Sequence, residues 1–436
     1  MQTNLADFIK DTPEGREAER ILRTCVHCGF CTATCPTYQL LGDELDSPRG
    51  RIYLIKQVVE GTPATAKTQL HLDRCLTCRS CETTCPSGVE YGKLIDIGRK
   101  VVEDQVGRGT IDGLKRKALN AGLPRPTLFG TGLALGRAVG GLLPASLKKK
   151  IPTVQSAATP WPAARHARRM VVLDGCVQPT LAPNINPAAA RVLDRIGISL
   201  VKAERAGCCG AVSFHLNFQD EGRDYMRRNV AAWLPLLDGG AEAIVMTASG
   251  CGVTVKEYGH HLENDAAWAA KAKQVSHATV DLSELLATET DKLVPLLERA
   301  ALGKPRRPLA FHSPCTLQHG QQLRGHAETL LKAAGFDLTY VPDSHLCCGS
   351  AGTYSLLQPE LSQRLLTNKL EALHSGDPVL IATANIGCLT HLQGGTAMPV
   401  KHWIELIDEV LGHPSPPGLT FAHAGRGSSL PVPRRG

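Results

Sequence analysis

Short apolar runs alternate with longer amphipathic segments along the second half of the chain. The short runs predict strands, and the longer segments predict helices that end at glycines such as Gly197 and Gly335. The pattern occurs twice, as Met170–Asp174, Ala188–Ile196, Ile198–Lys202, Gln219–Leu237 and the run before Cys251, then as Pro308–Phe311, Ala327–Ala334, Phe336–Val341, Pro359–Ser375 and the run before Cys388. Each series predicts a βαβαβ unit, and therefore a parallel sheet.

The N-terminal part carries helix signals instead. A capped amphipathic helix is predicted over residues 47–60, because Ser47 and Pro48 precede a periodic apolar run. Pro36 and Pro86 fit the first position of further helices, where no amide hydrogen is needed. The apolar stretch Thr127–Leu147 contains an arginine, a proline and five glycines, so we interpret it as a linker or interfacial segment and not as a membrane span.

These patterns predict a mixed α+β and α/β chain of several domains. We expect a helical N-terminal domain over residues 1–105, a linker over 106–168 with a basic end, and two pseudo-repeated parallel-sheet domains over 169–290 and 305–412. Residues 413–436 are rich in Pro, Gly and Ser, which predicts a disordered tail.

Composition narrows the functional classes. The chain has 436 residues, a net charge of +7 and only 4% aromatic residues, which argues against an aromatic-lined nucleic-acid platform. Residues 1–23 are polar and show no export signal. Because the cytosol keeps thiols reduced, the sixteen cysteines are expected to be metal ligands or redox groups and not disulfides.

The first eight cysteines form two copies of C-x2-C-x2-C-x3-C-P. Thiolates suit zinc, copper(I) or iron-sulfur clusters, but zinc ribbons use separated C-x-x-C pairs and leave the other cysteines of each motif without a role. The doubled motif resembles that of two-cluster ferredoxins, in which the fourth cysteine ligates the other cluster. We therefore expect two [4Fe-4S] clusters, one on Cys25, Cys28, Cys31 and Cys85 and the second on Cys75, Cys78, Cys81 and Cys35.

The other eight cysteines follow the second repeat. In both copies a single cysteine precedes a Cys-Cys-Gly by 32 residues (208−176 and 347−315), and a last cysteine follows after about forty more. The predicted strands end at these cysteines, so all of them are expected at the carboxyl edge of a sheet, where open α/β sheets bind ligands. Gly210 and Gly349 are expected to let the adjacent thiols converge. The candidate cluster sites are Cys176, Cys208, Cys209 and Cys251, and Cys315, Cys347, Cys348 and Cys388.

The combination resembles the iron-sulfur subunits of glycolate oxidase, and less closely those of heterodisulfide reductase and anaerobic glycerol-3-phosphate dehydrogenase. The resemblance rests on Leu22–Leu45, Ser344–Tyr354 and Thr383–Cys388 and covers nearly the whole chain. It implies an electron-transfer subunit that works beside two flavin subunits. These oxidise glycolate, or D-lactate, and pass electrons toward a quinone or another membrane acceptor.

The resemblance also implies a cytoplasmic location, peripheral on the inner face of the membrane, and no activity of the chain alone. The sequence fits this division, because Gly130–Gly136 has the wrong spacing and context for a dinucleotide-binding loop and no nucleophile–base motif is present. Two alternatives stay open, a thiol-redox enzyme that uses the Cys-Cys-Gly cysteines and a zinc-bound scaffold.

One departure from the heterodisulfide reductase pattern affects the second half. There the last cysteine belongs to a C-x-x-C pair, whereas this chain has Ala248 and Asn385 at the position three residues earlier. A five-thiolate site is therefore not expected, and four-thiolate clusters in one, both or neither copy stay open. His312, His319 and His345 lie near the second set and are candidates to ligate metal or to hydrogen-bond sulfur.

Overall fold

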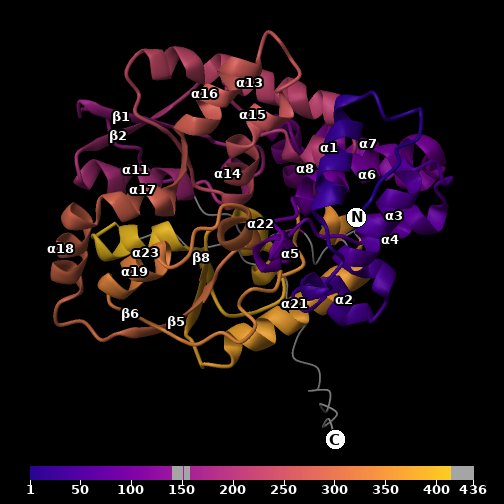
Figure 1. Cartoon of the computed structure of the whole chain (residues 1–436). Helices are drawn as coiled ribbons and strands as arrows, with labels where there is room; N and C mark the ends of the chain where they lie inside the picture. The colour runs from indigo at the N-terminus through magenta and orange to yellow at the C-terminus, as the bar shows by residue number, and fades with distance from the viewer. Residues whose placement is uncertain (140–150, 152–157, 414–436) are drawn as a thin grey trace, which may run out of the picture.

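The computed structural model describes residues 1–139, 151 and 158–413. A helical N-terminal domain packs against two α/β units, which we call copy 1 and copy 2 (Figure 1). The predicted tail lies outside the described residues, apart from His413.

The N-terminal domain is built from short helices around one apolar core. Ile21, Leu22, Ile55, Leu94 and Ile95 form the centre of this core and are almost fully buried. The helices are α1 (Pro13–Thr24), α2 (Pro36–Leu41), α3 (Pro48–Val59), α4 (Ala66–Asp73), α5 (Ser80–Thr84) and α6 (Tyr91–Val106), with short turns η1 (Phe30–Thr32) and η2 (Glu44–Asp46).

The helix signals of this domain are partly confirmed. Ser47 caps α3 as predicted, since its hydroxyl accepts the amide hydrogen of Gly50 at 2.9 Å. Pro36 begins α2. The prediction for Pro86 is wrong, because the chain turns after Cys85, with the Gly88 amide bonded to the Cys85 carbonyl at 3.3 Å, and α6 begins only at Tyr91.

Copy 1 is a parallel four-stranded sheet in the order β2-β1-β3-β4. Its strands are β1 (Arg168–Val172), β2 (Ile198–Lys202), β3 (Ile244–Met246) and β4 (Thr279–Asp281). Its helices are α10 (Gln178–Leu181), α11 (Ile185–Arg195), α12 (Ala211–His215), α13 (Gln219–Asp238), α14 (Ser249–Lys256), α15 (Tyr258–His261) and α16 (Ala269–Ala278).

Copy 2 repeats this topology, as β6-β5-β7-β8, after the connecting helices α17 (Leu282–Thr288) and α18 (Thr290–Ala301). Its strands are β5 (Arg307–His312), β6 (Phe336–Leu338), β7 (Leu380–Thr383) and β8 (Val400–His402). Its helices are α19 (His326–Ala333), α20 (Tyr354–Leu357), α21 (Pro359–His374), α22 (Ile386–Gln393) and α23 (Trp403–Val410), with a short helical turn η3 (Thr316–Gly320).

The predicted parallel sheets are confirmed, but each has a fourth strand that the sequence pattern did not reveal. β4 and β8 are three residues long, and each has a polar residue at its carboxyl end. A run this short has too few apolar positions to give a strand pattern, so only pairing with β3 and β7 identifies these strands.

The two copies share one hydrophobic core. Helix α11 of copy 1 and the connecting helix α17 face α19 and α23 of copy 2 between the sheets (Figure 1). Residues of both copies, from Met170 to Ile407, belong to a single buried cluster. Arg191 on α11 also donates to the buried carboxylate of Asp408 on α23, at 2.5 Å. The copies therefore form one packed body.

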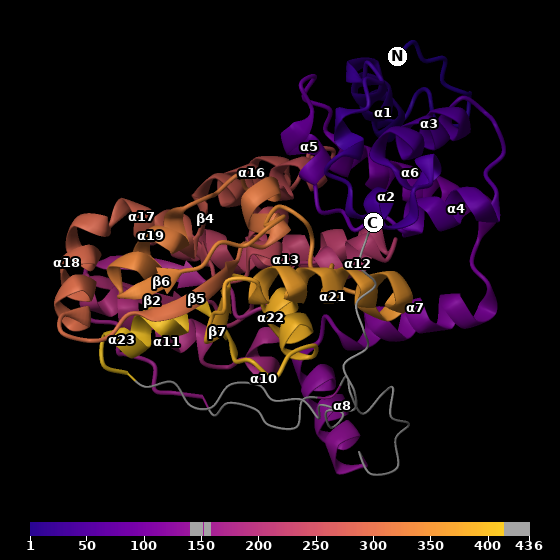
Figure 2. The same ribbon diagram turned by 90° about the horizontal axis from the view of Figure 1, so that it is seen from below.

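Two helices occupy the described part of the predicted linker. α7 (Thr110–Gly122) runs beneath the N-terminal domain and α8 (Pro126–Ala138) packs on α10 (Figure 2). None of the helices in the described ranges is long and apolar enough to cross a membrane.

The buried pair between the copies generates a stability prediction. Arg191→Met leaves Asp408 without its guanidinium partner, and we expect the free energy of unfolding to fall toward the low end of about 3–5 kcal/mol, because His413 still contacts the carboxylate. Chemical denaturation followed by circular dichroism measures the change.

Arg165→Met is the matched control, because this exposed arginine pairs with Asp194 at the surface. A surface pair contributes about 0–1 kcal/mol. Equal losses in the two variants would contradict a structural role for the Arg191–Asp408 contact.

Candidate iron-sulfur sites

The two N-terminal cysteine loops have the same backbone geometry. His27 and Gly29 in the first loop, and Thr77 and Arg79 in the second, have positive φ angles between 50° and 88°. Residues other than glycine rarely adopt this left-handed conformation, and it concentrates at functional sites. The repeated pair of left-handed residues curls each loop, so that thiols three residues apart face the inside of the loop.

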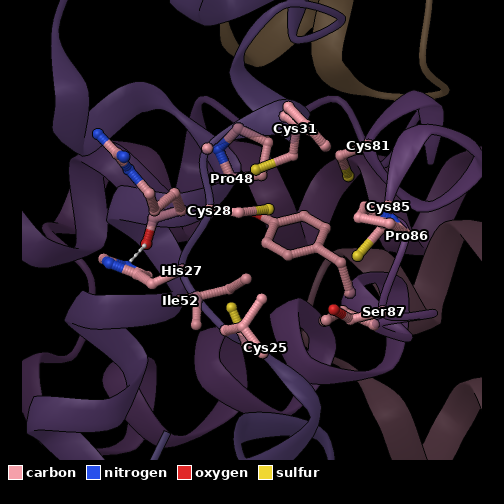
Figure 3. A pocket seen from close by; sticks show the side chains of 16 residues that line it. Cys25, His27, Cys28, Cys31, Pro48, Ile52, Cys81, Cys85, Pro86 and Ser87 are labelled. Atoms are coloured by element: carbon pink, nitrogen blue, oxygen red, sulfur yellow. Dashed lines mark hydrogen bonds between the residues drawn. The ribbon is translucent and has the colours of Figure 1, made fainter.

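The first loop encloses a small pocket. Cys25, Cys28, Cys31, Cys81 and Cys85 project around this pocket (Figure 3). The set thus includes all four cysteines predicted for the first cluster, together with one assigned to the second. His27 stabilises the loop through its Nε2 contact with the Arg49 carbonyl at 3.2 Å. Cys28 is exposed, so this site lies at the surface of the domain.

The second set lies deeper. Tyr91 donates its hydroxyl hydrogen to Cys75 Sγ at 3.6 Å, and the Cys35 thiol lies 3.3 Å from the Thr37 hydroxyl. The fully buried Arg51 donates to Thr37 Oγ1 and Asp46 beside these sulfurs. Burial raises the pKa of Cys81 well above its ordinary value, and the nearby Cys78, Cys75 and Cys35 add to the shift.

The chemistry of these donors fits an iron-sulfur cluster. Burial raises the pKa of Cys31 to about 11, so that at neutral pH this thiol keeps its proton unless a positive centre replaces it. A bound metal deprotonates coordinating thiols and supplies that charge. Sets made entirely of sulfur ligands select soft metals and iron-sulfur clusters.

In both α/β copies a single cysteine follows each of the two strands that flank the switch point of the sheet, and the cysteine pair follows the edge strand beside them. Cys176 and Cys251 follow the neighbouring strands β1 and β3, and Cys208–Cys209 follows β2. Copy 2 places Cys315, Cys388 and the pair Cys347–Cys348 in the same way after β5, β7 and β6. The strand order reverses at this crevice, where open α/β sheets bind ligands.

The glycine after each cysteine pair is required by its surroundings. Gly210 and Gly349 have φ angles of +93° and +88°. A Cβ at either position would lie 2.6 Å from a backbone carbonyl oxygen, that of Gly222 on α13 or Ser362 on α21. The amide of each glycine donates to the first cysteine of its pair at 3.4 Å.

Copy 1 brings its four cysteines into one chain of thiol contacts. A contact with Cys208 and burial raise the pKa of Cys176 well above its ordinary value. Contacts with Cys208 and Cys251, again with burial, raise the pKa of Cys209. Asn229 and Tyr258 fix the pair by donating to the Cys208 and Cys209 carbonyls at 2.8 and 2.7 Å.

Copy 2 has the corresponding set, with a histidine and a buried lysine beside it. Cys315 Sγ lies 4.0 Å from Cys347 Sγ, and ligand atoms of Cys348, Cys388 and His312 lie within 4.8 Å of one another. The buried ammonium group of Lys369 donates to the carbonyls of the loop that leads to Cys347. A buried cation here offsets the negative charge of thiolates.

The structure distinguishes the candidate histidines. His319 is engaged at both ring nitrogens, by the Thr83 hydroxyl at 2.8 Å and the His345 carbonyl at 2.9 Å. It therefore has no nitrogen left for a metal. Burial lowers the pKa of His312 to about 3, so its ring is neutral.

Asn385 stands where the heterodisulfide reductase pattern has a cysteine. Its side-chain amide donates to Cys388 Sγ at 3.6 Å.

The second N-terminal set adjoins the site of copy 2. An apolar cluster, which we call the junction, joins Leu76 and Cys78 of the N-terminal domain to Cys347, Tyr354 and Leu361 of copy 2. Burial raises the pKa of Cys78 well above its ordinary value, and the Cys315 thiol of copy 2 is the next largest cause. Two cysteine sets therefore meet across an apolar interface.

A separate cleft lies between α1, α6 and copy 1, and cysteines are not among its lining residues. Its lysine and arginine side chains are each paired with a carboxylate: Arg79 with Glu257, Lys93 with Glu90, Lys100 with Asp104, and Arg223 with Asp220. Because these cations are already neutralised, the cleft is poorly suited to bind a small carboxylate substrate.

Comparison with known proteins agrees with this arrangement of sites. A 4Fe-4S dicluster domain model matches residues 21–89, and a cysteine-rich domain model matches residues 170–256 and 309–393. The glycolate oxidase iron-sulfur subunit of Escherichia coli K12 is 56% identical over 94% of this chain and 99% of its own length. The chain belongs to the family of glycolate oxidase iron-sulfur subunits.

More distant relatives share the same framework. The "Probable glycolate oxidase iron-sulfur subunit" of Bacillus subtilis is 28% identical over 91% of this chain and 96% of its own length. Lactate utilization protein A of Bacillus velezensis is 27% identical over 50% of this chain and 88% of its own length. The family and its domains identify an iron-sulfur electron-transfer subunit, as the sequence predicted.

Several residues around the cysteines were not found from the sequence. Arg51, Tyr91 and Lys369 lie beside thiols in space but belong to helices without a motif. The only sequence signal was weak: Arg51 and Lys369 are charged residues at core-facing positions of amphipathic helices.

The Cys-Cys-Gly turn generates the second prediction. Gly349→Ala introduces both a left-handed alanine, at about 1–2 kcal/mol, and a clash with the Ser362 carbonyl. We expect a larger loss of stability than in the control Gly352→Ala, which has φ +61° but nothing within 4 Å of its added Cβ. Equal unfolding midpoints of the two purified variants would show that the close approach is not limiting.

Proposed function

We propose that this chain carries electrons from a flavin subunit that oxidises glycolate, or D-lactate, to an acceptor on the quinone side of the respiratory chain. Cys25, Cys28, Cys31 and Cys85 would hold one [4Fe-4S] cluster, and Cys75, Cys78, Cys81 and Cys35 the second. The cysteine sets of copies 1 and 2 would hold further iron-sulfur centres. When bound, these groups supply one-electron transfer.

The single observation that carries this proposal is the junction. Cys78 of the second N-terminal set and Cys315 and Cys347 of copy 2 share one apolar cluster. The Tyr354 hydroxyl donates to the Arg74 carbonyl at 3.2 Å, and Arg364 donates to the Leu40 carbonyl at 2.9 Å, which fixes the two domains against each other. A thiol-redox enzyme that used the Cys-Cys-Gly cysteines would not need this continuity with the dicluster domain.

The cysteine sets differ in solvent exposure, and this difference orders them along the proposed electron path. Cys28 is exposed, and its neighbours Val26 and Phe30 are 68% and 62% exposed. Cys347 and Cys348 are buried. The flavin partner would therefore dock on the Val26–Phe30 loop, and the electron path would lead inward from there to copy 2. Exposed apolar residues of this size at the rim of a redox site are typical of a partner surface.

The linker helices support a peripheral position on a membrane. Ile111 and Leu114 on α7 and Leu128 and Leu135 on α8 are all more than half exposed. Amphipathic helices with exposed apolar residues bind membrane interfaces without crossing them. The segment Gly130–Gly136, whose spacing does not fit a dinucleotide-binding loop, lies inside α8 and does not follow a strand.

A docking prediction tests the function. Co-expressed with the flavin subunits, the wild-type chain is expected to support glycolate-dependent dye and quinone reduction, whereas the isolated chain should neither oxidise glycolate nor bind flavin. Phe30→Glu should lower the apparent affinity for the flavin subunits by at least about tenfold, or ~1.4 kcal/mol, because it places a charge in the contact. Iron content should not change.

Leu302→Glu is the matched control, since this residue is 82% exposed and directly follows α18. That helix lies far from the N-terminal domain (Figure 1). It should leave the affinity unchanged. Glycolate oxidation by the isolated chain would contradict the proposed division of labour. An unaffected affinity in Phe30→Glu would contradict the proposed docking loop.

The crossed ligand assignment gives another prediction. Cys35→Ser should damage the cluster held by Cys75, Cys78 and Cys81, although Cys35 belongs to the first motif. Iron and sulfide analysis of anaerobically purified protein, with EPR of the reduced state, measures the loss and assigns the affected signal. Loss of the Cys25 signal instead would refute the crossing, and stoichiometric zinc with little iron would refute the iron-sulfur assignment.

A further inference from the structure

His312 is the one candidate histidine with a buried ring nitrogen that lacks a protein partner. Its side chain is 3% exposed at the carboxyl end of β5. Nε2 has no hydrogen-bond partner among the residues that the structure describes. Because a buried polar atom without a partner is costly, such an atom in a native protein needs an explanation.

The unpartnered atom lies in the cysteine site of copy 2. One ligand atom each of His312, Cys348 and Cys388 lie within 4.8 Å of one another. The other ring nitrogen, Nδ1, lies 3.0 Å from the hydroxyl of the fully buried Thr383. A histidine ligand characteristically donates its second N–H to such an acceptor, which fixes the ring and leaves the first nitrogen free to bind metal.

Copy 1 shows that the fold does not require this polar pair. Three residues before the first cysteine, copy 2 has His312 (315−3) and copy 1 has Leu173 (176−3). Five residues before the last cysteine, copy 2 has Thr383 (388−5) and copy 1 has Met246 (251−5). Leu173 and Met246 are buried in an apolar cluster. The same sheet position is thus filled by an apolar pair in one copy and a polar pair in the other.

We propose that His312 Nε2 is a ligand of the iron centre of copy 2. The imidazole joins the thiolates of Cys315, Cys347, Cys348 and Cys388 in a mixed site. Copy 1 offers thiolates alone. The inference rests on the proposed function, in that it takes the cysteines of copy 2 to hold iron.

The ligand type has a consequence for electron flow. A neutral imidazole places less negative charge on the metal than a thiolate, and histidine in place of cysteine raises the reduction potential of an iron-sulfur centre. Copy 2 is also the copy whose cysteines meet Cys78 at the junction. Imidazole ligation therefore makes the centre of copy 2 a better electron acceptor than an all-thiolate one, at the end of the path from the N-terminal domain.

The test uses full-length protein, purified anaerobically with its iron and labelled with [15N]histidine. Pulsed EPR of the wild type is expected to show the strong 15N coupling of a directly bound imidazole. The double variant His312→Leu/Thr383→Met introduces the apolar pair of copy 1 and should fold, but lose this coupling and part of the iron. His312→Cys should keep the iron, lose the coupling and lower the midpoint potential of the centre.

His319→Asn is the matched control, since it removes a neighbouring histidine whose two nitrogens are already bonded, and it should keep the coupling. Iron in copy 2 without 15N coupling in the wild type, or coupling that persists in the double variant, would overturn the proposal. An iron content of about eight per chain is expected for two [4Fe-4S] clusters alone. The same content of about eight in both the wild type and Cys348→Ser would also overturn the proposal. That last result would leave the N-terminal clusters of the proposed function intact.

Discussion

The apolar junction between the N-terminal domain and copy 2 is the contact on which the arrangement of the cysteine sets depends. The buried side chains of Leu76, Tyr354 and Leu361 surround the region where Cys78 approaches Cys315 and Cys347. Such packing keeps the dielectric constant low around the thiols, and burial accordingly raises the pKa of Cys78. The same packing that joins the domains thus favours a metal-bound state of the cysteines over free thiols.

Each α/β copy helps to build the surroundings of the other copy's cysteine site. The helix α14, which carries Cys251, packs on η3, the turn after Cys315, and α22, which carries Cys388, contacts α10, the helix after Cys176. Ser249 and Thr316 are joined by a hydrogen bond of 2.8 Å across this interface. The two crevices are consequently built in part by the opposite copy, which explains why the copies share one core.

The copies have nevertheless diverged in what surrounds their thiols. In copy 1 the cysteine pair is held by Asn229 and Tyr258, and the exposed Arg228 also donates to the Cys208 carbonyl at 3.4 Å. In copy 2 a buried lysine, Lys369, and His312 lie near the corresponding thiols. Changes in charge and ligand type are the means by which proteins adjust a metal centre without altering its fold. The same fold therefore surrounds its thiols with different side chains in the two copies.

The sequence alone determined the features that are local in the chain. Cysteine spacing indicated the dicluster motif, and the 32-residue interval revealed the repeat. Apolar runs gave the first three strands of each copy and helices α3, α11, α13, α19 and α21. These predictions succeed because ligand spacing and side-chain periodicity depend on residues close together in sequence. β4 and β8 escaped detection because three residues carry too little pattern, and Pro86 because the following turn, and not the proline, determines where α6 begins.

Only the tertiary structure decided what depends on distant residues. The shared core of the copies, the junction, the buried charges of Arg51 and Lys369, and the free nitrogen of His312 each bring together segments that are far apart in the chain. The two α/β copies could have been independent domains, and His319 and His312 were equal candidates by sequence. Packing settled both questions, because burial and hydrogen-bond partners are properties of the space around a residue and are not encoded in its immediate neighbours.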